Sequence, residues 1–274
     1  MKWLKRILIA LPVLALVVYF GLPKGLQAMG LHPHYDIPDF DLSGKRALIV
    51  TTSQGVLGDS GKATGVFGSE MSVPYYAFRD AGMAVDIASI KGGEIPVEPN
   101  SMSWPLATEA DYRFNGDSVA QAQLKNSIPI TDVDITKYDA VFLSGGWGAA
   151  YDFAQSPVLS ELITASYADG DVIGAVCHGA LGLVHAKDTD GSSLIEGRRV
   201  TGVTDLQVEQ LGISITPKHP ETELRAANAQ FQSNTAIRDF FANLVTVDGR
   251  IVTGQNQNSG AEAAHRMMEI LATK

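Results

Sequence analysis

The chain has 274 residues, of which 45% are hydrophobic and 19% charged, so it can bury a core in one large domain or two small ones and is not intrinsically disordered. Its net charge of -9 repels a polyanion, which excludes nucleic acid as an expected partner. The lone cysteine, Cys177, excludes internal disulfides and thiolate-cluster metal sites, and we expect neither a metal nor any other cofactor.

The first 22 residues differ in character from the rest. Residues 7–22 carry no charge and follow Lys2, Lys5 and Arg6, a pattern typical of a signal peptide or a membrane anchor. No small-x-small cleavage site follows directly, so we favour an uncleaved signal anchor. The positive-inside rule then predicts a membrane-anchored protein whose domain is extracytoplasmic, periplasmic in a bacterium. Residues 23–43, rich in Pro and Gly, are predicted to form a tether before a domain at 44–274.

In the domain, short β-branched runs alternate with amphipathic stretches, which predicts an α/β fold with a parallel sheet. The expected strands cover residues 46–52, 84–89, 139–143, 172–176, 200–202, 244–247 and 250–253. The expected helices cover residues 69–81, 157–168, a segment after Gly179 to about 186, and 259–272. Residues 92–137 are rich in Pro and Asp and are expected to line one edge.

Ligands of doubly wound sheets gather at the carboxyl ends of the strands. Three segments fall there: the turn after residues 46–52, the glycine-rich residues 145–148, and residues 176–179. A strand that stops at Cys177 and restarts as a helix after Gly179 is the arrangement of a nucleophile elbow. A helix N-terminus there lowers a thiol pKa and offers N–H groups to an oxyanion. The alternative is a buried structural cysteine.

Two further motifs are set aside. Residues 58–63 resemble a phosphate loop, but Val56 stands where its first Gly is required and Ala63 where Ser or Thr must hold magnesium. His219-Pro220-Glu221 resembles the His-x-Glu partner of glutamine amidotransferases. It lies only 42 positions after Cys177, and an exposed helix start is the favoured interpretation.

A series of short motifs, taken in order, covers roughly residues 46–271 and resembles the PfpI superfamily, whose fold is class I glutamine amidotransferase-like. These motifs are Thr64-Gly65 with Glu70, residues 73–78, 81–82, 85–89, 92–93, 98–101, 138–143, 145–148, 175–179 and 253–256. The chaperone and glyoxalase III branch is the most similar. The resemblance implies a flavodoxin-like parallel sheet sandwiched by helices, in a family that is commonly dimeric, so a homodimer is expected.

The resemblance also assigns roles to residues. Cys177 matches the nucleophile, His178 its neighbour, and Glu70 the acidic residue beside the thiol. Gly146 matches the loop whose backbone N–H helps to form the oxyanion site. No metal ligand is implied.

Three departures from the family pattern stand out. The acidic partner of the histidine is expected about thirty residues after the cysteine, but Gln207-Val208-Glu209 breaks the family's paired-acid pattern there. Glu209 is the first choice for this partner and Asp205 the second. Trp147 stands where many members have His and could alter or close the pocket. Gln257-Asn258 replaces the usual Pro-Ala.

The resemblance implies a cysteine-dependent enzyme acting on small 2-oxoaldehydes such as methylglyoxal, or a related deglycase. Cys177 would add to the aldehyde, His178 or Glu70 would move the proton, and water would release a 2-hydroxy acid without metal, nucleotide or glutathione. Two alternatives stay open: a thiol hydrolase (peptidase or amidase), and a membrane-anchored holdase or redox sensor.

Overall fold

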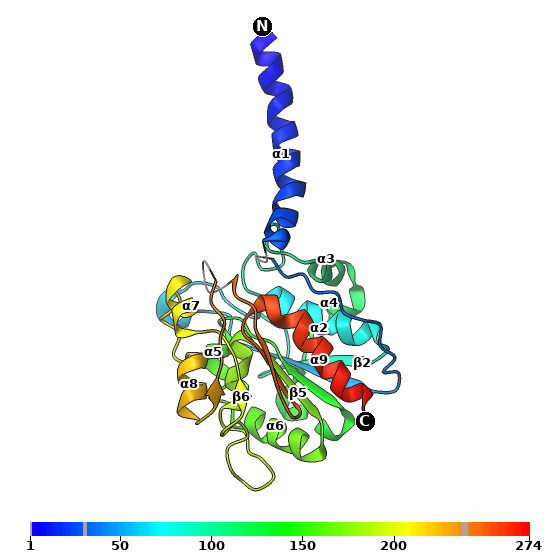
Figure 1. Cartoon of the computed structure of the whole chain (residues 1–274), viewed down its shortest axis with the longest axis vertical. Helices are drawn as coiled ribbons and strands as arrows, with labels where there is room; N and C mark the ends of the chain where they lie inside the picture. Colours follow the sequence, from blue (N-terminus) through cyan, green and yellow to red (C-terminus); the bar gives the residue numbers. More distant parts are fainter. Residues whose placement is uncertain (1, 30–31, 237–240) are drawn as a thin grey trace.

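The computed structural model describes residues 2–29, 32–236 and 241–274. A seven-stranded sheet lies between two layers of helices, and a long N-terminal helix projects away from this domain (Figure 1). The strand order is β3-β2-β1-β4-β5-β9-β8, parallel throughout except for β8, which is antiparallel to β9. The strands are β1 (Arg46–Thr51), β2 (Ala84–Ser89), β3 (Ile128–Pro129), β4 (Ala140–Leu143), β5 (Val172–Val176), β8 (Val245–Asp248) and β9 (Ile251–Gly254). The predicted sandwiched parallel sheet is confirmed.

The register of the central strands brings the predicted site segments together. Val50 of β1 pairs with Leu143 of β4, and Leu143 pairs with Ala175 of β5. These strands therefore end at one edge of the sheet, so the loops that follow them meet there.

Helices cover both faces of the sheet. They are α2 (Gly68–Asp80), α3 (Glu109–Gly116), α4 (Ser118–Lys125), α5 (Ala149–Asp152), α6 (Pro157–Asp169), α7 (Asp205–Gln210), α8 (Pro220–Ala226) and α9 (Gly260–Ala272). Short 3-10 turns are η1 (Gly58–Ser60), η2 (Ile130–Asp132), η3 (Ile135–Lys137), η4 (Cys177–Leu183) and η6 (Gln257–Ser259). The termini of α6 follow its sequence: the Ser156 side chain accepts a hydrogen bond from Leu159 N, Pro157 is the first helical residue, and Gly170 ends the helix in the left-handed region.

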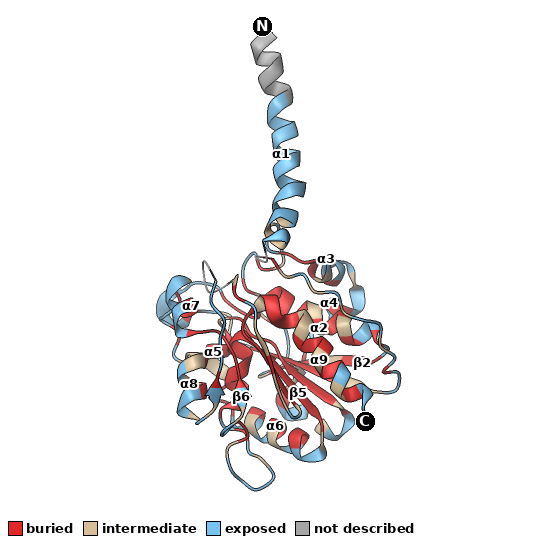
Figure 2. Cartoon of the chain, in the orientation of Figure 1, coloured by how far each residue is buried: buried red, intermediate tan, exposed pale blue. Residues whose placement is uncertain are grey.

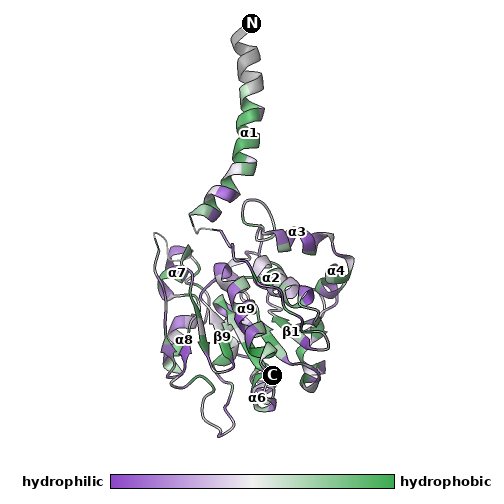
Figure 3. Ribbon diagram, turned by 45° about the vertical axis from the view of Figure 1, so that its right-hand side comes forward, coloured by the Kyte–Doolittle hydropathy of each residue, from purple (hydrophilic) through white to green (hydrophobic). Residues whose placement is uncertain are grey.

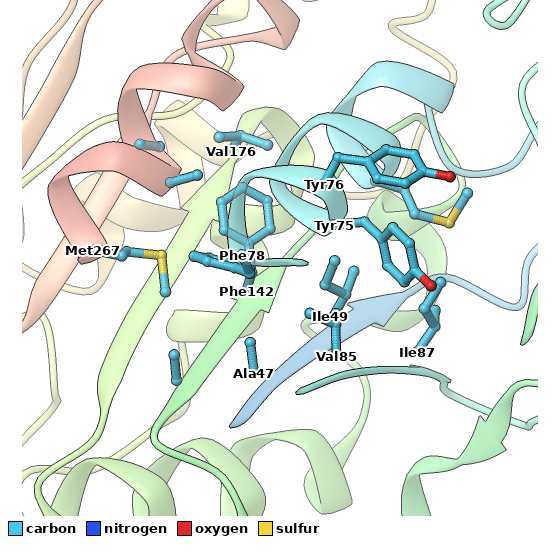
Figure 4. Close-up of a cluster of buried hydrophobic side chains, with 14 of the residues drawn as sticks. Ala47, Ile49, Tyr75, Tyr76, Phe78, Val85, Ile87, Phe142, Val176 and Met267 are labelled. Atoms are coloured by element: carbon cyan, nitrogen blue, oxygen red, sulfur yellow. The ribbon is translucent and has the colours of Figure 1, made fainter. Parts of the chain in front are cut away.

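Helices α2 and α9 pack on one face of the sheet (Figure 4). Phe78 of α2 meets Phe142 of β4 edge to face, with ring centroids 6.2 Å apart. Met267 of α9 lies over Gly174 of β5, where a Cβ would come within 2.2 Å of its sulfur. The central strands β1, β4, β5 and β9 are buried along nearly their whole length, as Figure 2 shows. This rigid sheet fixes the positions of the loops at its carboxyl edge.

One expected strand belongs elsewhere. Residues 199–200 form β6 (Arg199–Val200), which pairs with β7 (Gln230–Phe231) in a separate two-stranded sheet. The next residue, Thr201, donates its backbone N–H to Thr253 Oγ1 of β9 at 2.7 Å. Because this bond goes to a side chain and not to the backbone of β9, the segment does not extend the main sheet.

The N-terminal helix α1 spans Lys2–Ala28, continues through Pro23, and is apolar and exposed along residues 10–20 (Figure 3). Its segment Ala10–Ala28 is long and apolar enough to cross a membrane by length and composition, as signal sequences also are.

The segment after α1, residues 32–43, is hydrogen-bonded to the domain. Tyr35 Oη lies 2.7 Å from His265 Nδ1 of α9, and Leu42, which is buried, donates its N–H to Ala81 O. Residues 32–43 thus lie along the domain, where the sequence predicted a tether.

Candidate active site

Cys177 occupies a strained turn between β5 and η4. Its φ of 57° lies in the left-handed region, which a side chain other than glycine rarely adopts and which costs about 1–3 kcal/mol. The side chain is 7% exposed. The 3-10 turn η4 begins at Cys177 itself, whereas the sequence predicts a helix that starts only after Gly179. This geometry is that of a nucleophile elbow.

Glu70 lies beside this sulfur. It stands in the first turn of α2 and is buried. Burial raises the pKa of Glu70 to about 8, although hydrogen bonding to Cys177 and to the backbone of Gly145 acts in the opposite direction. At neutral pH the carboxyl group therefore mostly retains its proton.

The glycine loop after β4 closes over both groups. A Cβ on Gly145 would lie 2.4 Å from Glu70 Oε2 and 2.8 Å from His178 N, so only glycine fits. Gly146 has φ +106°, and a Cβ there would lie 2.3 Å from Gly65 O. Backbone N–H groups of His178 and Gly146 hydrogen-bond to the Cys177 sulfur. The structure thus places two backbone donors around the Cys177 sulfur.

The thiol and its histidine neighbour are both neutral. Burial, and then the charge of Glu70, raise the pKa of Cys177 well above its ordinary value. His178 Nδ1 lies 3.5 Å from the sulfur, and the ring is fully buried. Burial, with a further contribution from His219, lowers the pKa of His178 to about 3. The resting site is therefore a thiol beside a neutral imidazole and a protonated carboxyl.

The structure does not bring the predicted acidic third residue to this site. Glu209 and Asp205 both lie exposed on the short helix α7. Asp205 accepts a hydrogen bond from Thr222 Oγ1 at 2.7 Å, on α8. Within the described ranges, His178 forms a hydrogen bond to neither of them.

His219 is a residue of this site that the sequence interpretation set aside. It is the N-cap residue of α8 and is half-buried, and it contributes, after burial, to the lowered pKa of His178. The sequence signal was the His-Pro-Glu motif at a helix start. Its spacing to Cys177 gave no reason to place the two together, since their proximity depends on how α8 packs.

Trp147 is partly buried and packs against the hydrophobic core cluster that includes Val176 and Cys177. The domain also has a cavity of about 810 Å³, which lies away from Cys177 and Trp147. It is bounded by the end of α1, residues 32–40 and helices α2 and α3. Gln257 and Asn258, the other departure, form η6 before α9. Among the described residues, no three His, Cys, Asp or Glu side chains gather as a metal site requires.

Comparison with known proteins places this geometry in a family. The model of the DJ-1/PfpI family matches residues 62–270. The chain belongs to the DJ-1/PfpI family. Glyoxalase 3 of Candida albicans is 30% identical over 80% of this chain and 95% of that protein. The glutathione-independent glyoxalase HSP31 of Saccharomyces cerevisiae is 30% identical, over 84% of this chain and 99% of its own length. The crystal structure of glyoxalase III from Candida albicans superposes with a TM-score of 0.75 at 28% identity, covering 82% of this chain and 97% of that one.

These matches correct the predicted location. They account for 95–99% of the relatives' lengths, and the DJ-1/PfpI match begins at residue 62, far beyond α1. The family domain is thus complete without a membrane segment, and a single apolar helix is weak evidence for one. The prediction of a membrane-anchored protein with an extracytoplasmic, periplasmic domain is wrong.

Proposed function

We propose that this DJ-1/PfpI protein is a glutathione-independent glyoxalase that converts methylglyoxal and similar small 2-oxoaldehydes to 2-hydroxy acids. The observation that carries the proposal is the buried Glu70 carboxyl beside Cys177 at the strained turn. The names of the relatives, glyoxalase 3 and glutathione-independent glyoxalase, support the same reaction.

The first step is addition of the Cys177 sulfur to the aldehyde carbon. A protonated carboxyl group has one donor and one acceptor oxygen, so Glu70 can accept the S–H proton while it passes its own proton to the aldehyde oxygen. The product is a neutral hemithioacetal, and Glu70 ends the step protonated. Because the thiol is not ionised at rest, this relay is what makes the sulfur nucleophilic.

The second step moves hydrogen from the first carbon to the second. His178 is neutral and can accept the proton of the hemithioacetal carbon, which leaves an enediolate held by the N–H groups of Gly146 and His178. Return of the proton to the second carbon gives a thioester. Water then cleaves the S–C bond, which releases the 2-hydroxy acid and restores the thiol, so that one carbon is oxidised and its neighbour reduced.

The thiol hydrolase alternative is less well supported. Peptide cleavage needs an imidazolium that is oriented by an acidic group and protonates the leaving amine. Glu209 and Asp205 are exposed, and within the described ranges neither forms a hydrogen bond to His178. The family's implied homodimer and a deglycase activity remain predictions, open to sedimentation and to assays on glycated amines.

The test replaces Cys177 with serine in the full chain. We expect methylglyoxal consumption without glutathione in the wild type, with lactate as the product seen by proton NMR, and a loss of at least ~10³-fold in Cys177→Ser. His185→Gln, at an exposed histidine near the end of η4, is the control and should keep wild-type turnover. Full turnover in Cys177→Ser would contradict the proposal.

A further inference from the structure

Asp152, the last residue of α5, is a half-buried carboxylate that has no role in the proposed mechanism. Both of its carboxylate oxygens lie 2.9 Å from Thr52 Oγ1, and Oδ2 accepts the backbone N–H of Ser53 at 2.8 Å. Thr52 Oγ1 in turn accepts the N–H of Gln54 at 2.9 Å. Asp152 therefore holds the first three residues that follow β1.

This turn after β1 also touches the glycine loop after β4. A Cβ on Gly148 would lie 2.7 Å from Thr52 Cγ2 and 2.6 Å from Gln54 O, so Gly148 lies directly against the turn. The Thr52 side chain is thus in contact with Asp152 through its hydroxyl and with Gly148 through its methyl group.

Hydrogen bonds connect Asp152 to the start of the same loop. Ala149 N donates to Gly146 O at 3.2 Å, and Tyr151 N donates to Gly148 O at 2.9 Å. Residues 146–152 therefore form one hydrogen-bonded run, with Gly146 at its first position and Asp152 at its last.

The start of this run packs against the elbow. A Cβ on Gly145 would lie 2.7 Å from Val176 O and 2.8 Å from His178 N, the two residues that flank Cys177. The N–H of Gly146 is one of the two backbone donors to the sulfur. A displacement of residues 146–152 would therefore move a donor away from Cys177.

A carboxylate at position 152 does not favour folding at neutral pH. Burial raises the pKa of Asp152 to about 6, although the hydrogen bonds from Ser53 and Thr52 act in the opposite direction. Since this folded pKa exceeds the ordinary 3.8, the free energy of unfolding falls as pH rises from 3.8 to 6. The stability of the fold alone thus gives no reason for an ionised group here.

We infer that Asp152 is a positioning residue, which anchors residues 146–152 to the turn after β1 and so holds the Gly146 N–H beside the Cys177 sulfur. Its effect on catalysis rests on the proposed function, in which the Gly146 N–H holds the enediolate. A donor of this kind stabilises a developing oxyanion only when it is already in place, and removing one costs about 10²- to 10³-fold in kcat.

The first test measures hydrogen exchange of the Gly146 N–H in the full chain by ¹⁵N NMR. In Asp152→Ala the anchor is lost, and we expect this N–H to exchange at least ~10-fold faster. Asp152→Asn keeps one acceptor oxygen for the N–H of Ser53 and should restore part of the protection.

Asp171→Ala is the matched control. Its carboxylate is also buried and accepts a hydrogen bond from Ser166 Oγ, but it precedes β5, at the opposite end of that strand from Cys177. Unchanged Gly146 exchange in Asp152→Ala, or an equal acceleration in Asp171→Ala, overturns the inference. If Asp152→Ala fails to fold by circular dichroism, Thr52→Val decides, since it removes the bonded hydroxyl and keeps the shape: wild-type Gly146 exchange there overturns the inference.

Kinetics on methylglyoxal give a second measurement. We expect Asp152→Ala to lower kcat about 10-fold with KM nearly unchanged, because the donor that it positions acts on charge that develops after binding. Asp171→Ala should keep the wild-type kcat, and a wild-type kcat in folded Asp152→Ala overturns the catalytic role. If the wild type turns over no methylglyoxal, the proposed function fails, while the exchange of Gly146 still decides whether Asp152 positions this N–H.

Discussion

The proton on Glu70 is the central feature at the scale of single residues. Burial keeps this carboxyl protonated near neutral pH, and in the proposed mechanism that proton lets it serve both the thiol and the aldehyde oxygen. An ionised carboxylate could accept the thiol proton but would have none to donate. The same proton links the site to the stability of the fold, since the folded chain binds it far more tightly than the unfolded chain does.

Glu70→Gln should separate these effects. The folded pKa of about 8 exceeds the ordinary 4.5, so the wild-type free energy of unfolding falls as pH rises from 4.5 to 8, a decline that the glutamine variant lacks. We expect Glu70→Gln to gain stability relative to wild type from pH 5 to pH 9 and to lose about 10²- to 10⁴-fold in kcat. Urea unfolding at several pH values measures the first effect. Glu109→Gln, at an exposed position, is the control, and parallel stability profiles for wild type and Glu70→Gln would refute the argument.

Single residues also show how far the sequence predicts the site. Cys177, Glu70 and Gly146 lie in local motifs next to buried strands or helix starts, so their placement follows once the sheet is assigned. The third position is different. Whether Glu209 or His219 reaches His178 depends on how two short helices pack, and no local pattern contains that information.

At the scale of elements, the loop after β4 connects the sheet to the chemistry. Phe67 N donates to Gly145 O and Gly148 N donates to Gly65 O, so the loops after β4 and β1 are fastened to each other. Both run from adjacent parallel strands, which set their spacing. The position of the Gly146 N–H therefore depends on the packing of these two loops against each other.

Gly146→Ala tests that dependence against a matched glycine. Gly170 has a similar φ of +101°, but a Cβ there meets nothing within 4 Å, whereas at Gly146 it would lie 2.3 Å from Gly65 O. We expect Gly170→Ala to cost about 1 kcal/mol of unfolding free energy, and Gly146→Ala to cost at least ~3 kcal/mol and to abolish turnover. Denaturant titration and the methylglyoxal assay compare them. An equal loss of unfolding free energy in the two variants would mean that the loop after β4 accommodates the extra methyl group, and would contradict this prediction.

Among the elements, the long β-branched strands were the most predictable. β2 matches the predicted range, and β1, β4 and β5 differ by at most one residue at an end. The two-residue strands β3, β6 and β7 are set by long-range pairing and carry too little pattern to be placed. The predicted tether begins at residue 23, whereas α1 continues through Pro23 to Ala28.

For the whole molecule, the boundary between α1 and the rest of the chain lies after Ala28. Residues 10–20 are largely exposed, and the second half of α1 contacts the domain at Tyr19, on which Trp104 stacks with ring centroids 5.7 Å apart. Residues 32–43, in contrast, contribute buried Leu42 and the bond from Tyr35 to His265. The domain therefore uses the second segment as part of its own packing.

Two truncations should separate these segments. Removal of residues 1–28 should change the melting temperature by less than about 3 °C, because little surface of α1 is buried. Removal of residues 1–43 should lower it by at least about 5 °C, since a buried leucine and two hydrogen bonds are lost. Differential scanning calorimetry measures both, and equal melting temperatures would show that residues 32–43 do not contribute to stability.

The chain has one cysteine, and it lies at the elbow. A thiol reagent that is released as a chromophore would therefore report on the reaction centre alone, with no background from other sulfurs. Because the folded thiol is buried and not ionised at rest, it reacts slowly, whereas an unfolded chain reacts fast. The slowly labelled fraction would therefore count the folded chains and convert a bulk rate into a turnover number per folded chain.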